Sequence, residues 1–180
     1  YNMDLNPKII YHNIELIQCL GLCIHIHNGK FLTPEDEIIR KSYYYLGCHI
    51  FQENNNVTIT LPDKVIYKYT VIYIDALEFT SKRKRSSVVV YNHSKQKYFI
   101  FSKGSVDAIQ CLIKDVDKAT MQYNDEIIVN DYAELRVLAC AYKELCEFQP
   151  VDNYTDNDLD KIESDLQYVG MIGLKDTLQD

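Results

Sequence analysis

The sequence predicts an α+β domain in which helices flank an antiparallel β-sheet. Three observations lead to this class. The first quarter of the chain has the apolar spacing of helices, the middle carries β-branched segments joined by short turns, and the last third alternates helical and extended patterns. Because short turns between consecutive strands require antiparallel pairing, the helices must pack against an antiparallel sheet.

Two helices are predicted before the strands begin. Apolar residues recur at helical spacing over residues 9–27, and Asn28-Gly29 then indicates a stop. Thr33 is a good N-cap, and a proline and three acids follow it in the first turn. This second helix should run to about Leu46, with Gly47 as its C-cap.

Antiparallel strands are predicted in the middle of the chain. Residues 57–61 alternate and are β-branched, and a turn follows them. Residues 65–79 form one long strand or two joined strands. Residues 87–91 and 97–101 predict a hairpin across the turn at 92–94.

The C-terminal third predicts further helices and two strands. A short helix is expected over residues 105–113, and another should end within residues 132–135. Strands are expected over residues 137–142 and 166–174. The stretch rich in Asp and Asn at 151–160 indicates a loop or the approach to a helix.

Composition limits the classes of function. The chain has 180 residues, of which 47% are hydrophobic and 25% charged, as expected for one folded domain rather than a disordered chain. The net charge of −7 argues against a general nucleic-acid binder, which would usually be basic. No apolar run reaches the ~20 residues of a membrane span.

The six cysteines include one local cluster that could suggest a metal. Cys19 and Cys23 are four residues apart, and His25 and His27 follow them. A zinc site needs ligands that converge from several directions, and no distant second half accompanies this cluster. Most of the cysteines lie in apolar runs, which favours reduced core thiols over zinc.

The first segment that suggests chemistry combines an aromatic ring with positive charge. Phe79 ends an extended segment and is followed by four consecutive cations at 82–85, before a buried strand. A ring can stack on a base, and cations can bind phosphates. Three other readings stay open for the basic run: a solvated basic turn beside a core Phe, a nuclear-localisation signal and a nucleic-acid patch.

Two further features could bind an anion. Lys103 and Gly104 stand at a strand-to-helix junction, where the lysine supplies charge and the glycine permits close backbone approach. The spacing of a Walker loop is absent. Arg136 enters a buried strand and therefore needs a partner, either a phosphate or a nearby acid in a structural ion pair.

Together and in this order, these motifs resemble the nucleotide-binding (N) domain of P-type ATPases, and most closely its phospholipid-flippase branch. The segment LEFTSKRKRSSVVV at 77–90 resembles the signature LEF-S-x-RKR-x-SVxV. Residues 101–105 resemble the CKGA motif, and residues 135–138 resemble LRTL. The pair TPEDE and LG at 33–47, and DLQYVG with KDTLQD at 165–180, resemble further stretches of the family.

The resemblance implies the N-domain fold, an antiparallel sheet flanked by helices, and an ATP site. That site would comprise Asp36, Phe79, Ser81, Lys84, Lys103, Gly104 and Arg136. Phe79 would stack on adenine, and Lys103 would lie beside the adenine pocket or the phosphates. Lys84 and Arg136 would contact the phosphate chain, and Ser81 would line the same strand end. Asp36 stands where the family usually has a Glu that contacts the adenine amino group.

The resemblance also implies what surrounds this domain. Residues 1–174 would be the N domain and residues 175–180 the start of the hinge to the phosphorylation domain. The phosphorylated Asp of the DKTGT motif and the ligands of Mg²⁺ would lie outside this stretch, so no catalytic or metal-binding residue is assigned here. The partners would be ATP, the phosphorylation and actuator domains and an accessory subunit of a multi-pass membrane pump, with this domain in the cytosol. The isolated domain should bind ATP without turnover.

Two rival functions remain open at this point. A flippase-like regulatory domain of a larger protein, for example one fused to a guanylate cyclase, is compatible with departures from the family pattern at Asp36, Ser86 and Ser105. A nucleic-acid-binding domain would depend on residues 82–85 alone. The resemblance implies no nucleic-acid partner.

Overall fold

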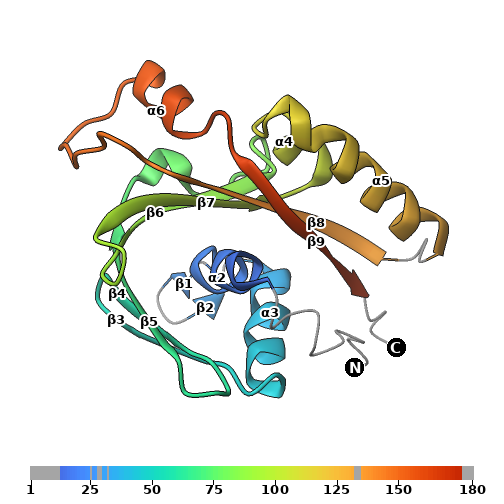
Figure 1. Ribbon diagram of the computed structural model, residues 1–180, viewed down its shortest axis with the longest axis horizontal. Helices are drawn as coiled ribbons and strands as arrows, with labels where there is room; N and C mark the ends of the chain where they lie inside the picture. Colours follow the sequence, from blue (N-terminus) through green and yellow to red (C-terminus); the bar gives the residue numbers. More distant parts are fainter. Residues whose placement is uncertain (1–12, 25, 28–29, 32, 132–134, 176–180) are drawn as a thin grey trace.

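The computed structural model describes residues 13–24, 26–27, 30–31, 33–131 and 135–175. Its centre is a seven-stranded antiparallel sheet with strands in the order β3-β4-β5-β6-β7-β8-β9. The sheet curves around helices α2 and α3, and helices α4 and α5 cover its other face (Figure 1). The predicted α+β class is therefore confirmed.

The bounds of the elements follow the chain. The sheet strands are β3 (His49–Glu53), β4 (Asn56–Thr60), β5 (Ile66–Ile72), β6 (Arg85–Asn92), β7 (Lys97–Gly104), β8 (Leu135–Glu144) and β9 (Gln167–Lys175). A separate two-stranded ribbon consists of β1 (Ile26–His27) and β2 (Lys30–Phe31). The helices are α2 (Ile14–Leu22), α3 (Pro34–Tyr45), α4 (Val106–Gln110), α5 (Asp115–Asp131) and α6 (Asp156–Ile162), with a 3₁₀ turn η1 (Asp75–Leu77).

Helix α3 has the ends that the sequence predicted. The Thr33 side chain accepts a hydrogen bond from the backbone N–H of Asp36 at 3.2 Å, which caps the first turn. Gly47, just beyond the helix, has a φ of +75°, a conformation that glycine adopts without strain. The extent of the helix is thus fixed by local signals that can be read from the sequence.

The first helix is shorter than predicted. Helix α2 ends at Leu22, and Ile26–His27 pair with Lys30–Phe31 as a β-ribbon, so the expectation of a helix through His27 was wrong. A short apolar run has a spacing compatible with helix and strand alike, which explains the error. The start of the predicted helix at 9–12 and the stop at Asn28-Gly29 lie outside the described residues.

The predicted hairpin is confirmed as β6 and β7, which pair from Arg85 opposite Gly104 to Asn92 opposite Lys97. The extended region predicted at 65–79 is shorter, because β5 ends at Ile72 and the turn η1 follows. Strand β3 was not predicted at all. Only one of its five residues, Ile50, is buried, so it lacks a clear alternation.

Helical structure in the C-terminal third exceeds the prediction. Helix α5 spans 17 residues and ends at Asp131, one residue before the range 132–135 in which a helix end was expected, and Leu135 already belongs to strand β8. Residues 132–134 lie outside the described residues. Helix α6 occupies the region predicted as a loop or helix approach, and a capping box between Thr155 and Asp158 begins it.

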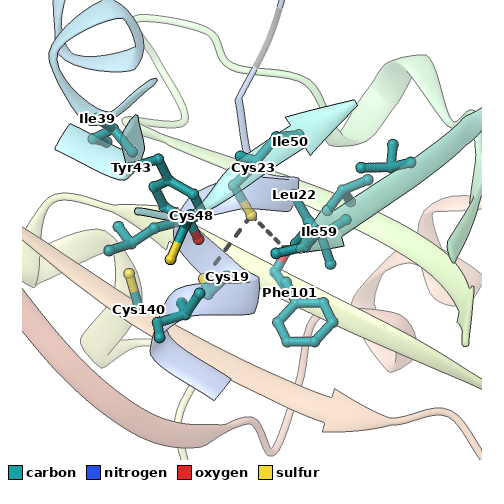
Figure 2. Close-up of a cluster of buried hydrophobic side chains, with 14 of the residues drawn as sticks. Cys19, Leu22, Cys23, Ile39, Tyr43, Cys48, Ile50, Ile59, Phe101 and Cys140 are labelled. Atoms are coloured by element: carbon teal, nitrogen blue, oxygen red, sulfur yellow. Dashed lines mark hydrogen bonds between the residues drawn. The ribbon is translucent and has the colours of Figure 1, made fainter. Parts of the chain in front are cut away.

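Two apolar cores lie on opposite faces of the sheet. Val88 and Val90 face α2 and α3, whereas Val89 between them faces α4 and α5, as alternation along a strand requires. Figure 2 shows the first core, where Cys19 and Cys23 of α2 lie against Phe101. Among the described residues, no helix has the length and apolar character needed to cross a bilayer.

Candidate nucleotide-binding site

A buried ion pair joins the end of β7 to the start of α3. Lys103 shares a sheet face with Phe101 and points toward α3, where its Nζ lies 2.5 Å from Oδ1 of Asp36. Lys103 is 6% exposed and Asp36 only 2%. Buried charges are costly unless they are paired, so this contact fixes both side chains. Two of the predicted site residues therefore touch directly.

A second predicted cation lies against the same helix. Arg136, on the neighbouring strand β8, forms an ion pair with Glu35, which directly precedes Asp36. The arginine side chain is about half exposed, whereas the carboxylate is largely covered. The structural ion pair that was one reading of Arg136 thus exists, but its acid is 101 residues away in sequence. Consecutive acids in the first turn of α3 hold two cations from adjacent strands.

Gly104 lies where the chain entering β6 presses against β7. The backbone N–H of Ser105 donates to the carbonyl of Lys84 at 3.0 Å. A Cβ atom added at Gly104 would lie 2.5 Å from that carbonyl oxygen, so no larger residue fits without a backbone shift. Lys84 itself has a φ of +53° and an exposed side chain. The structure therefore brings Lys84 and Gly104 together beside Lys103.

Phe79 and Ser81 lie on the segment between η1 and β6. This segment, residues 78–84, is called the entry loop here. Its first anchor is buried Leu77, and its turn is closed by hydrogen bonds from the N–H groups of Arg83 and Lys84 to Thr80. The Phe79 side chain is 40% exposed, and Ser81 is also exposed. The ring is thus accessible, and the loop that carries it ends at Lys84, against Gly104.

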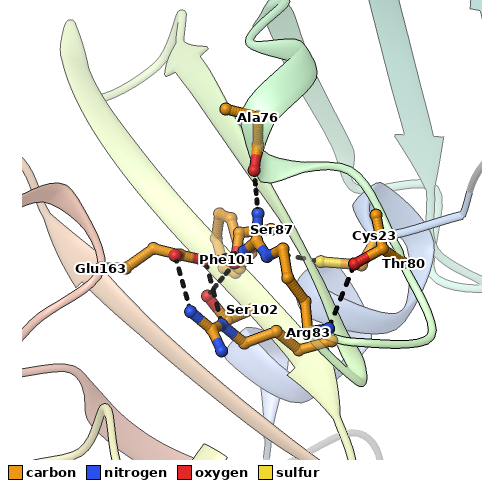
Figure 3. Close-up of polar contacts among 9 residues, drawn as sticks. Cys23, Ala76, Thr80, Arg83, Ser87, Phe101, Ser102 and Glu163 are labelled. Carbon is orange, nitrogen blue, oxygen red and sulfur yellow. Dashed lines mark hydrogen bonds and ion pairs between the residues drawn. The ribbon is translucent and has the colours of Figure 1, made fainter. Parts of the chain in front are cut away.

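The four consecutive cations do not act alike. Arg83 points to Glu163 at the end of α6 (Figure 3), and Arg85 pairs with the same carboxylate. Lys82 and Lys84 remain exposed. Burial lowers the pKa of the Arg83 guanidinium from its usual value, and Glu163 opposes this shift. The segment therefore does not present a continuous run of four exposed charges, which weakens the nucleic-acid interpretation.

Two contributors to this region were not found in the sequence. Glu35 and Glu163 hold three of the cations, but each lies far from its partners along the chain. Glu35 belongs to an acidic first turn that was interpreted only as favourable to the helix dipole. No sequence signal distinguished Glu163 from the other acids near α6.

A cavity of about 160 Å³ lies beside the entry loop, on the same face of the sheet as α2. Leu77 and Glu78, which precede Phe79, line one side of it, and Leu22 and Val88 line another. Its lining is mixed, because Arg40, Gln52 and Asn55 join the apolar side chains there. The entry loop therefore borders both the exposed cations and a hollow of mixed polarity.

Four of the six cysteines are buried as core thiols, whereas Cys111 and Cys146 are exposed. Cys19 donates to the carbonyl of Ser102 at 3.2 Å, and Cys23 to that of Phe101 at 3.4 Å (Figure 2). Burial raises the pKa of the Cys19 thiol well above its usual value, so the metal-binding thiolate is disfavoured. Within the described parts of the chain, no group of three His, Cys, Asp or Glu side chains is placed to hold a metal ion.

Comparison with known proteins gives the family. A family model described as the P-type ATPase cytoplasmic domain N matches residues 67–180. The endoplasmic reticulum transmembrane helix translocase of Schizosaccharomyces pombe is 30% identical over 148 residues, 78% of this chain and 12% of that protein. The vacuolar cation-transporting ATPase YPK9 of Saccharomyces cerevisiae is 24% identical over 152 residues, 81% of this chain and 10% of that protein.

The extent of these matches decides what they show. The chain spans about a tenth of the length of the two curated relatives. The family model, in contrast, covers more than half of the chain and includes Phe79, Lys103 and Arg136. The antiparallel sheet flanked by helices agrees with that family. The chain therefore belongs to the cytoplasmic N domain family of P-type ATPases.

Proposed function

We propose that this domain binds ATP at the end of the sheet where α3 meets β7 and β8, and presents the γ-phosphate to an aspartate elsewhere in the pump. The observation that carries the proposal is the convergence of cations from separate strands on the first turn of α3. Lys103 and Arg136 are both held there, and Lys84 lies two residues before Ser86, the strand partner of Lys103. Cations so placed can balance the charge of a triphosphate.

The residues present fit ATP in their chemistry. The accessible ring of Phe79 offers a face on which adenine can stack. Asp36 is buried and contributes by holding Lys103 in place, and Ser81 offers a hydroxyl on the entry loop. Lys84 and Arg136 have exposed side chains that can reach phosphate oxygens. ATP supplies the phosphoryl group, and the domain contributes binding and orientation.

The remaining parts of the reaction belong to the rest of the pump. We assign the Mg²⁺ that accompanies ATP to ligands in other domains, as the resemblance to the family implies. The phosphorylation and actuator domains of the same chain would receive the phosphoryl group and complete the cycle. The parent protein would then be a multi-pass membrane protein with this domain in the cytosol and an accessory subunit beside it.

An ATP titration tests the binding site directly. In calorimetry or NMR, the domain should bind ATP, and Phe79→Ala should weaken binding by about tenfold, since stacking of a base on an aromatic ring is worth roughly 1–3 kcal/mol. The matched control is Phe51→Ala, because Phe51 is also exposed but lies on the edge strand β3. Equal affinities of the two variants would contradict the proposed site. Phosphate release by the isolated domain would contradict the proposal that hydrolysis requires the other domains of the pump.

For the transported substrate we propose a phospholipid, on the resemblance of residues 77–90 to the flippase signature. The two relatives carry names that refer to other substrates, a transmembrane helix and a cation. The full-length protein in vesicles would decide between these classes. Phospholipid headgroups should stimulate ATP hydrolysis, and stimulation by a hydrophobic peptide or a cation instead would refute the flippase assignment.

A further inference from the structure

Glu163 is a buried carboxylate at the centre of a polar network. It follows the last residue of α6, is 8% exposed, and faces the start of β6 (Figure 3). Its Oε1 accepts hydrogen bonds from Arg83 and from the hydroxyl of Ser87, the latter at 2.6 Å. The Nη2 atom of Arg85 donates to Oε2 at 3.0 Å, and its Nε donates to Oε1 at 3.3 Å. Both oxygens are therefore occupied by donors.

This network clamps the entry loop from two sides. Arg83 also donates to the carbonyl of Ala76 in η1, so one guanidinium links Glu163 to the start of the loop. Arg85 and Ser87 link the same carboxylate to β6, directly after the loop. The hydroxyl of Ser87 lies 2.7 Å from that of Ser102 on β7, which ties the clamp to the sheet.

The clamp holds the segment that carries three of the proposed ATP contacts, Phe79, Ser81 and Lys84. Phe79 and Lys84 are both on the entry loop and both exposed, so their own packing does little to fix them. Their placement must come from the buried groups that bracket the loop. One carboxylate that binds two guanidinium groups and a hydroxyl is the most highly connected of those groups.

We propose that Glu163 is a positioning residue for nucleotide binding, which fixes the entry loop so that Phe79 and Lys84 face ATP together. This inference rests on the proposed function. It makes Arg83 and Arg85 parts of the clamp rather than phosphate ligands. If Arg83 and Arg85 bound phosphate instead, loss of Glu163 would release them, and the affinity for ATP would rise rather than fall.

The test uses Glu163→Gln, which keeps the shape and removes the charge. The matched control is Asp160→Asn, which removes an exposed acid from the same helix. If the loop is correctly placed in only a tenth of the variant molecules, the Kd for ATP rises about tenfold. The Kd for adenosine should rise by the same factor, because the loop carries the Phe79 ring. Ser87→Ala, which leaves all charges in place, should give a smaller increase and serves if Glu163→Gln does not fold.

A second readout separates this inference from the proposed function. Hydrogen exchange in residues 78–84 should quicken in Glu163→Gln without ligand, while exchange in α5 stays as in the wild type. Under conditions where the variant is folded, unchanged or tighter ATP binding would overturn the positioning role. If the wild type binds no ATP, the proposed function is refuted. Glu163 then has no role in nucleotide binding, even if its loss still quickens hydrogen exchange in the loop.

Discussion

The clearest quantitative prediction compares alanine substitutions at Gly104 and Gly173. In both, the added Cβ would meet an atom at 2.5 Å, but the obstacles differ. At Gly104 the obstacle is the backbone carbonyl of Lys84, with Arg85 Cβ at 2.6 Å behind it. At Gly173 it is the terminal methyl group of Leu135, a flexible side chain. The same Gly→Ala change therefore clashes with rigid backbone at position 104 and with a movable side chain at position 173.

The expected magnitudes follow from these obstacles. Ordinary contact begins near 3.4 Å, so Gly104→Ala must push the chain at Lys84 away by about 1 Å, which typically costs roughly 1–3 kcal/mol. The shift also strains the hydrogen bond from Ser105 to Lys84. Alanine also lowers the entropy of the unfolded chain, but this stabilises the fold by only about 0.4–1 kcal/mol. We expect a net loss of about 2 kcal/mol, or roughly 4–8 °C in Tm for a domain of this size.

For Gly173→Ala a rotamer change of Leu135 costs about 0.5–1.5 kcal/mol and is largely offset by the same entropy. Urea unfolding of the two variants, monitored by circular dichroism, measures both free energies. Equal stabilities, or a Gly104→Ala variant at least as stable as the wild type, would refute the claim that the backbone around Lys84 is rigid.

Two further predictions concern buried groups. Asp36→Ala should lower the free energy of unfolding by about 3 kcal/mol, because it leaves the buried Lys103 ammonium without this carboxylate. The double variant Asp36→Leu, Lys103→Met should recover most of that loss, as urea unfolding can measure. A fully stable Asp36→Ala variant would show that the ion pair contributes little. In native protein near neutral pH, a thiol-alkylating reagent should modify the exposed Cys111 and Cys146 rapidly and the other four cysteines slowly, as mass spectrometry of timed samples can show. Burial raises the pKa of Cys19 and so suppresses its thiolate, and alkylation of Cys19 at the rate of Cys111 would contradict the packing of the first core.

Local signals explain which elements could be predicted from the sequence. Thr33 and Gly47 bracket α3 because each satisfies a requirement of one helix end, independent of the rest of the fold. For α5 the sequence predicted an end within residues 132–135 but no start, so its length was not predicted. Its apolar residues do not form one stripe, since Val116 is exposed while Met121 is buried. Its helicity depends on packing against β8 and β9, which no local pattern reveals.

In the candidate site, too, some features could be predicted from local sequence and others could not. Lys103, Gly104 and Phe79 were identified from short motifs, and the family match includes all three. The pairing of these cations with acids was found only in the structure, because Asp36 is 67 residues from Lys103 and Glu163 is 80 residues from Arg83. Pairing between charges so distant in sequence is set by topology alone. The roles of these residues in ATP binding remain predictions.

The order of the strands has a consequence for how the domain is made. Each strand of the sheet from β4 to β9 pairs with the one synthesised just before it. The sheet can therefore grow strand by strand as the chain leaves the ribosome, without waiting for distant partners. Helix α2 is the exception, since Asn13 before it donates to the carbonyl of Val169 on the last strand at 2.7 Å. The first helix among the described residues is thus among the last to be fixed in place, when β9 has been synthesised.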